Sequence, residues 1–284
     1  MVTYALHGDL IAAGYIVAIQ DVRGKHKSEG VYVMTRPLRG ELNASDTDHA
    51  TDGFDTIDWL VQNVPESNGH VGTTGISYDG FTALDAIGPY SVLHLIPGAE
   101  VRWLGEKSGP TKDETATCEI VADAVWEECR EPEILVVPGG SGNRHLIGDE
   151  RLSEWLRGVH ENTQYTTSVC TGSLLLAGAG ILDGLEATTH WLAMDILEEN
   201  GARPTSKRVV EQGKVITSAG VSSGIDMSLR LTELLYGPEL AQTLQLAIEY
   251  DPEPPFDAGS PDKAPEGIAD AVRMGMKMAG SDYN

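Results

Sequence analysis

The stretch Thr166-Thr-Ser-Val-Cys170-Thr-Gly-Ser-Leu-Leu175 decides the fold of the region around it. A short β-rich run ends at Cys170, and an apolar helix is predicted to begin directly after it. Such a turn forces the side chain out of the sheet, and the first amides of the helix, those of Thr171 and Gly172, point at it. That field favours the thiolate, which is the nucleophilic form of cysteine. The position therefore suits covalent catalysis, and a buried structural cysteine is the alternative.

Strands and helices alternate along the chain around this turn. Strands are predicted near residues 99–104, 134–137, 165–169 and 215–218, and helices near residues 149–159, 172–182, 190–199, 225–235 and 239–249. The proline-rich stretch 251–257 predicts an extended segment, and a last helix is expected at 264–279. This order is typical of a mostly parallel, doubly wound sheet, in which ligands bind beyond the carboxyl ends of the strands.

Two further features lie where such strands are expected to end. In Val136-Val-Pro-Gly-Gly-Ser-Gly142, a buried strand opens into a glycine turn. The amides of this turn, together with those after Cys170, can stabilise a developing negative charge. Asp85 is a carboxylate inside an apolar run that follows a weak strand at 70–76. Because isolated carboxylates are seldom buried, Asp85 either caps its helix or works in a pocket.

Composition narrows the class of protein. The chain has 284 residues, and its 43 acidic and 20 basic side chains give a formal net charge of −23. The length indicates about two domains. The charge argues against nucleic-acid and anionic-membrane partners, and it fits either ordinary solubility or a high-salt environment. The three cysteines lack metal-type spacing, so we expect no disulfide framework and a cytoplasmic location. We find neither a leader pattern nor a run of ~18 apolar residues, and we expect a soluble protein.

Six stretches together resemble the ThiJ/PfpI superfamily and, within it, the isonitrile hydratase branch. They are Tyr78-Asp-Gly-Phe-Thr-Ala-Leu-Asp-Ala-Ile-Gly-Pro89, Val137-Pro-Gly-Gly140, Ser168-Val-Cys-Thr-Gly-Ser-Leu-Leu-Leu176, Ala187-Thr-Thr-His-Trp191, residues 220–226 and residues 249–261. The resemblance implies an α/β flavodoxin-like fold of the class I glutamine amidotransferase type over residues 71–284. It also implies a homodimer with active sites near the interface, a small-molecule substrate and no cofactor.

The same resemblance implies a reaction. In the isonitrile hydratase branch a cysteine attacks the terminal isonitrile carbon, an acid handles the proton, and water releases an N-substituted formamide from a thioimidate. Here the catalytic roles fall on Cys170 and Asp85, with Thr171 beside the sulfur and Gly139 and Gly140 lining the pocket. Peptidase-like and deglycase-like members of the superfamily usually carry histidine directly after the cysteine. Because this chain has Thr171 there, the hydratase is favoured.

Residues 14–80 resemble a different family, the α-amino acid ester hydrolases and their X-Pro dipeptidyl-peptidase relatives. The matching stretches are residues 20–24, 32–37, 55–61, 63–69 and 75–80. This resemblance implies that Ser77 is the nucleophile of an α/β-hydrolase triad. The acid and histidine of such a triad are expected downstream, where the chain resembles the other family. We therefore predict an α/β-hydrolase-derived appendage over residues 1–70 and expect residues 71–76 to form the first strand of the second sheet.

Three functions stay open at this point. The leading one is a cofactor-free, cysteine-dependent hydratase that acts on isonitriles. The second is a serine esterase or amidase that uses Ser77. The third is a non-catalytic stress-response or redox-sensing module in which Cys170 is oxidised.

Overall fold

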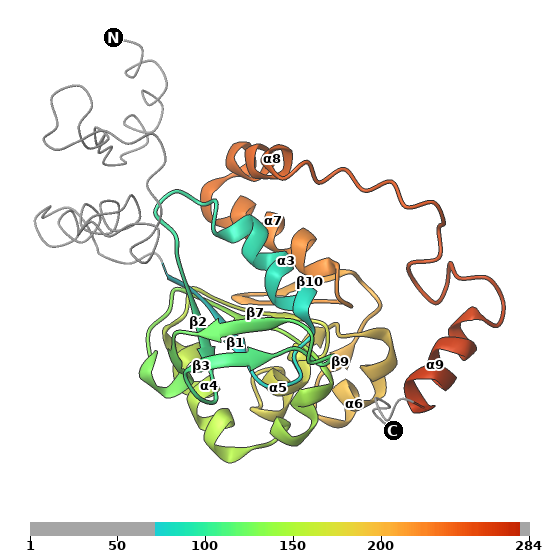
Figure 1. Cartoon of the computed structure of the whole chain (residues 1–284), viewed down its shortest axis with the longest axis horizontal. Coiled ribbons are helices and arrows are strands. Elements are labelled where there is room, and N and C mark those ends of the chain that lie inside the picture. The colour runs from blue at the N-terminus through green and yellow to red at the C-terminus, as the bar shows by residue number, and fades with distance from the viewer. Residues whose placement is uncertain (1–71, 279–284) are drawn as a thin grey trace, which may run out of the picture. The chain divides into compact units, whose positions relative to one another are not determined.

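A seven-stranded sheet forms the centre of the fold (Figure 1). In the computed structural model, which describes residues 72–278, its strands lie in the order β10-β11-β7-β6-β1-β2-β5. Their bounds are β1 (Gly72–Ser77), β2 (Glu100–Gly105), β5 (Ala124–Val125), β6 (Ile134–Val137), β7 (Tyr165–Val169), β10 (Val209–Gln212) and β11 (Val215–Ser218). Neighbouring strands are parallel except for β10 and β11, which are antiparallel. The five strands β2-β1-β6-β7-β11 have the flavodoxin-like order, with the topological switch between β1 and β6.

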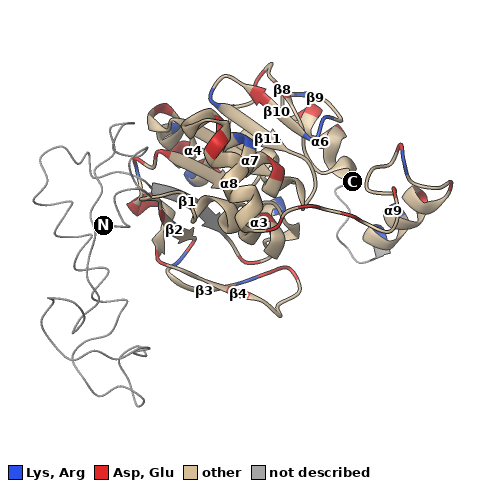
Figure 2. Ribbon diagram, turned by 90° about the horizontal axis from the view of Figure 1, so that it is seen from above, with Lys and Arg blue, Asp and Glu red and all other residues tan. Residues whose placement is uncertain are grey.

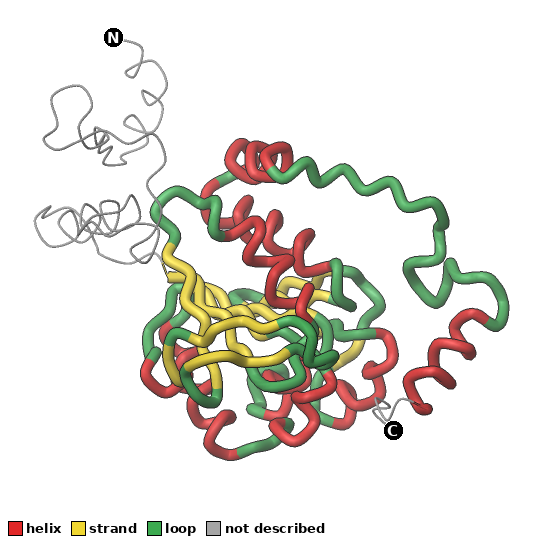
Figure 3. Tube along the Cα trace, in the orientation of Figure 1, coloured by secondary structure: helices red, strands yellow, loops and turns green. Residues whose placement is uncertain are grey.

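Helices cover both faces of this sheet, as the red segments in Figure 3 show. The α-helices are α3 (Ala83–Leu93), α4 (Glu150–Asn162), α5 (Gly172–Gly178), α6 (Met194–Glu199), α7 (Ser223–Tyr236), α8 (Pro238–Ala247) and α9 (Ile268–Met278). Helix α7 packs against both α3 and α8, whereas α4 packs against α5. The connection from β1 to β2, through α3, therefore runs over one face of the sheet. The connections from β6 to β7 and from β7 to β11, through α4 and through α5 and α6, run over the other face, as a doubly wound sheet requires.

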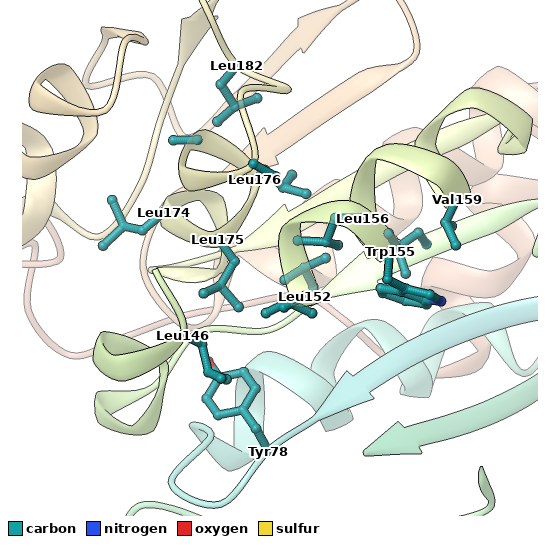
Figure 4. Close-up of a cluster of buried hydrophobic side chains, with 14 of the residues drawn as sticks. Tyr78, Leu146, Leu152, Trp155, Leu156, Val159, Leu174, Leu175, Leu176 and Leu182 are labelled. Carbon is teal, nitrogen blue, oxygen red and sulfur yellow. The ribbon is translucent and has the colours of Figure 1, made fainter. Parts of the chain in front are cut away.

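The side chains of β6 show how the sheet divides the core into two layers. Ile134 and Val136 join one apolar cluster, together with Met227 and Leu231 of α7. Leu135 and Val137 alternate with them and join the other cluster, because successive side chains in a strand point to opposite faces. Figure 4 shows part of this second cluster, where leucines of α4 and α5 lie together with Leu146 and Tyr78. Full burial of each leucine stabilises the fold by about 1.5–3 kcal/mol.

Smaller elements connect the main ones. They are the antiparallel hairpin β3 (Gly109–Lys112) and β4 (Glu119–Ala122), the pair β8 (Glu186–Ala187) and β9 (Arg203–Pro204), and the 3₁₀ turns η1 (Trp126–Glu128), η2 (Ser141–Leu146) and η3 (Trp191–Ala193). The sequence analysis did not predict these strands, nor the edge strands β5 and β10. Each of them is only two to four residues long, which is too short to show an alternation of apolar and polar residues.

Several predicted boundaries differ from the structure. Helix α5 ends at Gly178, four residues before the predicted end, and Gly180 has a φ of +77°, which an α-helix does not allow. The last helix begins at Ile268 instead of residue 264, directly after Gly267, whose φ is +81°. The strands predicted at 134–137, 165–169 and 215–218 are confirmed residue for residue.

The expected first strand of the sheet is also confirmed. β1 pairs in parallel with β2 on one side and with β6 on the other. Its last residue is Ser77, which lies in register with Gly105. The predicted appendage over residues 1–70 lies outside the described residues.

Acidic side chains are spread over helices and loops of the described region (Figure 2). They are not gathered in one tail, in agreement with the dispersed acidity of the sequence. Between residues 72 and 278 there is no helix with both the length and the apolar character that crossing a bilayer requires.

Candidate active site

Cys170 follows β7 directly and has a backbone conformation that non-glycine residues rarely adopt. Its φ is +56°, and such strain persists only where the surroundings hold it. The amide of Cys170 donates to the carbonyls of Ser218 (3.0 Å) and Ala219 (3.1 Å) at the end of β11. Its carbonyl accepts from the hydroxyls of Ser173 (3.1 Å) and Thr189 (3.0 Å). The strand-to-helix turn predicted from the sequence is therefore present and firmly held.

Three neighbouring parallel strands bring the predicted residues together. Asp85 lies in the first turn of α3, after β1, while Gly139 and Gly140 follow β6, and Cys170 follows β7. Because β1, β6 and β7 are adjacent and parallel, these segments meet at one edge of the sheet, beside the topological switch. Residues that are far apart in the sequence, such as Asp85 and Cys170, thus lie close together in the fold.

Asp85 forms a hydrogen bond to the glycine turn after β6 and does not cap its own helix. The residue is fully buried, and its Oδ2 accepts a hydrogen bond from the Gly139 amide at 2.9 Å. Within the described residues Oδ1 has no hydrogen-bond partner of good geometry, but the Cys170 side chain lies close enough for a hydrogen bond that affects the pKa of Asp85. Of the two interpretations that the sequence left open, the structure does not support the helix cap, and the pocket stays a prediction.

Burial raises the pKa of both groups. The pKa of Asp85 rises from its ordinary 3.8 to about 8, mainly because burial disfavours the carboxylate, and Glu114 adds to this rise. The hydrogen bonds of Asp85 with Gly139 and Cys170 lower it only in part. Burial and the charge of Asp85 raise the pKa of the Cys170 thiol well above its usual range. At neutral pH the pair is therefore a carboxylic acid beside a thiol.

The sequence-based expectation of a resting thiolate is therefore wrong for this structure. The amide of Thr171 does face the sulfur and lowers the pKa of Cys170, and the amide of Val221 does the same. Gly172, which was expected to contribute, does not appear among the hydrogen-bond donors that lower this pKa. Burial outweighs the two amides because a thiolate that is fully removed from water loses more hydration free energy than two hydrogen bonds return to it.

The glycine turn after β6 positions the acid and the neighbouring hydroxyl. The Gly139 amide is bonded to Asp85, and the Gly140 amide donates to Thr171 Oγ1 at 3.0 Å. A Cβ at Gly139 would lie 2.5 Å from the Thr171 nitrogen and 2.9 Å from Asp85 Oδ2, so glycine is required there. Both amides are engaged in these hydrogen bonds, and the oxyanion role expected for them stays a prediction.

Three residues of the site were missed by the sequence analysis. Val221, with a φ of +31°, presents its amide to Cys170 from the turn after β11. Asn143 Nδ2 donates to the carbonyl of Thr171 at 2.8 Å, and Glu114 influences the charge of Asp85. The stretch 220–226 was noted as a matching motif, but nothing in its residue types pointed to an amide aimed at Cys170.

Ser77 is the last residue of β1 and pairs with Gly105, whereas the nucleophile of an α/β-hydrolase lies in the turn that follows its strand. Within residues 72–278, no three His, Cys, Asp or Glu side chains meet in a way that could hold a metal ion.

Comparison with known proteins places this geometry in a family. The pattern of the DJ-1/PfpI family matches residues 76–234. The chain belongs to the DJ-1/PfpI family. A second pattern, that of X-Pro dipeptidyl-peptidase (S15 family), matches residues 2–89, and the two matches overlap over residues 76–89. The fusion inferred from the two resemblances is thus confirmed at the level of sequence.

Individual members of the DJ-1/PfpI family give a closer comparison. The chain is 41% identical over 190 residues to an isonitrile hydratase of Pseudomonas putida, a match that covers 67% of this chain and 83% of that protein. It is 32% identical over 171 residues to the HTH-type transcriptional regulator CdhR of Pseudomonas aeruginosa, covering 59% of this chain but only half of the regulator. The crystal structure of a ThiJ/PfpI family protein from Pseudomonas syringae superimposes with a TM-score of 0.71 at 33% identity, covering 78% of this chain and 94% of that one.

Proposed function

We propose that this protein is an isonitrile hydratase, which adds water to an isonitrile to give an N-substituted formamide. The observation that carries the proposal is the buried, neutral Asp85 carboxyl beside the Cys170 thiol at the strained turn. Two features support it further: the identity to the Pseudomonas putida enzyme, and Thr171 in the position directly after the cysteine.

The first step joins the substrate to the enzyme. The terminal carbon of an isonitrile can accept both a proton and a nucleophile. Asp85 gives its proton to that carbon, while the Cys170 sulfur forms a bond to the same carbon. The thiol proton passes to Asp85 and restores its acid form. The product is a thioimidate, and no net charge has been placed in the buried pocket, which a neutral acid–thiol pair suits better than an ion pair would.

The second step releases the product. Water adds to the thioimidate carbon, with its hydroxyl on carbon and its proton on nitrogen. The carbon–sulfur bond then breaks, the hydroxyl proton returns to sulfur, and the N-substituted formamide leaves. Asp85 is placed to move these protons because it lies beside Cys170. The overall reaction consumes one isonitrile and one water molecule.

Turnover of cyclohexyl isocyanide tests the proposal. Wild-type protein should produce N-cyclohexylformamide, and Cys170→Ala should lower kcat/KM by at least about 1,000-fold, because the nucleophile is lost. Ser77→Ala is the matched control and should leave turnover unchanged. Hydrolysis of p-nitrophenyl esters that is lost in Ser77→Ala would instead favour the serine esterase. Sulfinic acid formation at Cys170 without any isonitrile turnover would favour the redox-sensing module.

We also propose that the protein is a homodimer that works in the cytoplasm. Helix α3 carries a row of half-exposed apolar side chains at three-residue spacing, Leu84, Ile87 and Tyr90, on the helix that presents Asp85. A second copy that packs on this row would remove it from water. Light scattering of the protein as it elutes from a size-exclusion column should give twice the mass of the 30.4-kDa chain, and a mass of one chain would contradict the dimer.

A further inference from the structure

Glu114 lies between the two segments that meet at Asp85. It follows β3 in the hairpin of β3 and β4, and no catalytic motif in the sequence includes it. Its Oε1 accepts a hydrogen bond from Thr82 Oγ1 at 3.1 Å, and its Oε2 accepts one from the Ser141 amide at 3.3 Å. Thr82 directly precedes α3, and Ser141 directly follows the glycine turn. One carboxylate therefore joins the start of α3 to the turn after β6.

The backbone fixes the place of this carboxylate. The Glu114 amide donates to the Phe81 carbonyl at 2.9 Å, and the Gly80 amide donates to the Lys112 carbonyl at 2.9 Å. The start of α3 is also bonded to the turn directly, since the Thr82 amide donates to the Gly139 carbonyl at 2.8 Å. The hairpin is thus attached along residues 80–82, and the Glu114 side chain reaches the site from a fixed base.

We propose that Glu114 is a positioning residue for the Cys170–Asp85 pair, which holds the start of α3 against the glycine turn and places a negative charge at the start of the helix that carries Asp85. The geometric part follows from the two hydrogen bonds described above. The electrostatic part follows from charge repulsion, which raises the pKa of Asp85 in addition to burial. The proposal deepens the hydratase function, but its structural and electrostatic parts do not require that isonitriles be the substrate.

Other charges around Glu114 must be considered before an effect is assigned to it. Several of them are engaged elsewhere: Lys112 pairs with Glu119 at 3.8 Å, Lys107 pairs with Asp79 at 3.6 Å, and Asp113 accepts from the amides of Thr117 and Cys118 at 3.0 Å. The turn η2 adds Arg144 and His145, of which His145 lies 3.9 Å from Glu106. Facing Asp85 itself, the groups that shift its pKa are Glu114, Cys170 and the Gly139 amide.

The decisive variant is Glu114→Gln, which removes the charge and keeps the size of the side chain. The matched control is Glu119→Gln, which removes the same charge from β4 of the same hairpin, where the side chain pairs with Lys112. The readout is ¹³C NMR of aspartate carboxyl carbons in the full-length protein, titrated with pH, with the Asp85 signal identified by its absence in Asp85→Asn. This readout reports protonation directly and needs no turnover.

We expect the titration midpoint of Asp85 to fall by about 0.3–0.5 pH units in Glu114→Gln at low ionic strength, because Glu114 is exposed and its charge is partly screened. Glu119→Gln should leave the midpoint in place. Added salt should lower the midpoint in the wild-type protein and have a smaller effect in Glu114→Gln. Because the whole chain carries a formal net charge of −23, only the difference between the two salt responses is assigned to Glu114.

The pH dependence of kcat/KM should shift in the same direction as the NMR midpoint of Asp85. If isonitriles are turned over, the alkaline decline of kcat/KM should move to lower pH in Glu114→Gln by the same amount as the NMR midpoint. An Asp85 midpoint that is equal in wild type, Glu114→Gln and Glu119→Gln would overturn the proposal. Absence of isonitrile turnover in the wild-type protein would overturn the proposed function, while the NMR titration would still decide the role of Glu114.

Discussion

Asp85 keeps a proton at neutral pH that most aspartates have lost. It is fully buried, and one hydrogen bond from the Gly139 amide is too little to compensate a carboxylate for lost water. The Cys170 thiol beside it is neutral for the same reason. The two groups together can deliver a proton and a sulfur nucleophile to one carbon atom. The protonation states of Asp85 and Cys170 are therefore set mainly by burial.

Asp85→Asn should separate stability from catalysis. Below pH 4 Asp85 is protonated in both the folded and the unfolded chain, so it makes no pH-dependent contribution there. Between pH 4 and about 8 the unfolded chain releases this proton and the folded chain keeps it, so the stability of the wild type declines as pH rises. Asparagine does not ionise, so the variant has no such pH-dependent loss of stability. Its side-chain oxygen can still accept a hydrogen bond from the Gly139 amide.

Urea unfolding at two pH values measures this effect. Asp85→Asn should be more stable than wild type by about 2–4 kcal/mol at pH 8 and nearly equal to it at pH 4. Its kcat/KM for the isonitrile should fall by about 100- to 10,000-fold, because the proton donor is gone. An asparagine variant that is less stable than wild type at pH 8 would contradict the raised pKa of Asp85.

Single residues were predictable where the signal is local. The turn at Cys170 follows from a β-rich run that meets an apolar helix, and the structure has it at that residue. The state of the thiol was not predictable, because burial depends on α3 and the β11 turn, which are distant in sequence. Glu114 and Val221 were missed for the same reason. Their contributions come from an exposed carboxylate and a backbone amide that only the fold brings to the site.

At the scale of elements, the site depends on how closely the glycine turn after β6 approaches α3 and α5. The Gly139 amide bonds Asp85 of α3, and the Gly140 amide bonds Thr171 at the start of α5. There is no room for a side chain at Gly139. The turn therefore sets how far Asp85 lies from Thr171, the residue directly after Cys170.

Gly139→Ala should reduce both stability and activity. The added methyl would lie 2.5 Å from the Thr171 nitrogen, so we expect a loss of about 2–4 kcal/mol in unfolding free energy and a large fall in kcat/KM. Gly158→Ala is the matched control, because Gly158 is exposed within α4 and nothing lies near the position of its Cβ. This control should stabilise the protein by about 0.5–1 kcal/mol and leave turnover unchanged. Equal effects of the two alanines would argue against the close approach.

Elements with a strong pattern were predictable and short ones were not. The buried strand β6 is a continuous apolar run and β7 is rich in β-branched residues, and the predicted bounds of both agree with the structure. The hairpin of β3 and β4 was not predicted, although it carries Glu114 to the site. Its four-residue strands show no clear alternation, and their pairing depends on tertiary contacts.

At the scale of the whole molecule, two families share one chain. The matches overlap over residues 76–89, which include the end of β1 and the start of α3. Both folds need a parallel strand that leads into a helix at this place, so the same residues satisfy both patterns. The boundary near residue 70 was predicted from the two resemblances in the sequence, and it stays a prediction because residues 1–71 lie outside the described part of the chain.

Limited proteolysis tests this boundary. If residues 1–70 are an appendage without their usual partners, a protease at low concentration should cleave them before it cleaves the sheet that starts with β1. Mass spectrometry should then find a persistent fragment that begins near residue 71 and still contains Cys170. Cleavage of both parts at the same rate would argue that the first 70 residues pack as well as the remainder.

The most direct test of the central claim is the mass of the protein during turnover. After rapid mixing with cyclohexyl isocyanide and quenching, intact-mass and peptide mass spectrometry should find a species heavier by the mass of one isonitrile, with the addition on Cys170. The addition should decay as N-cyclohexylformamide accumulates, and it should be absent in Cys170→Ala. Formamide production without any addition on Cys170, or at an equal rate in Cys170→Ala, would contradict the account.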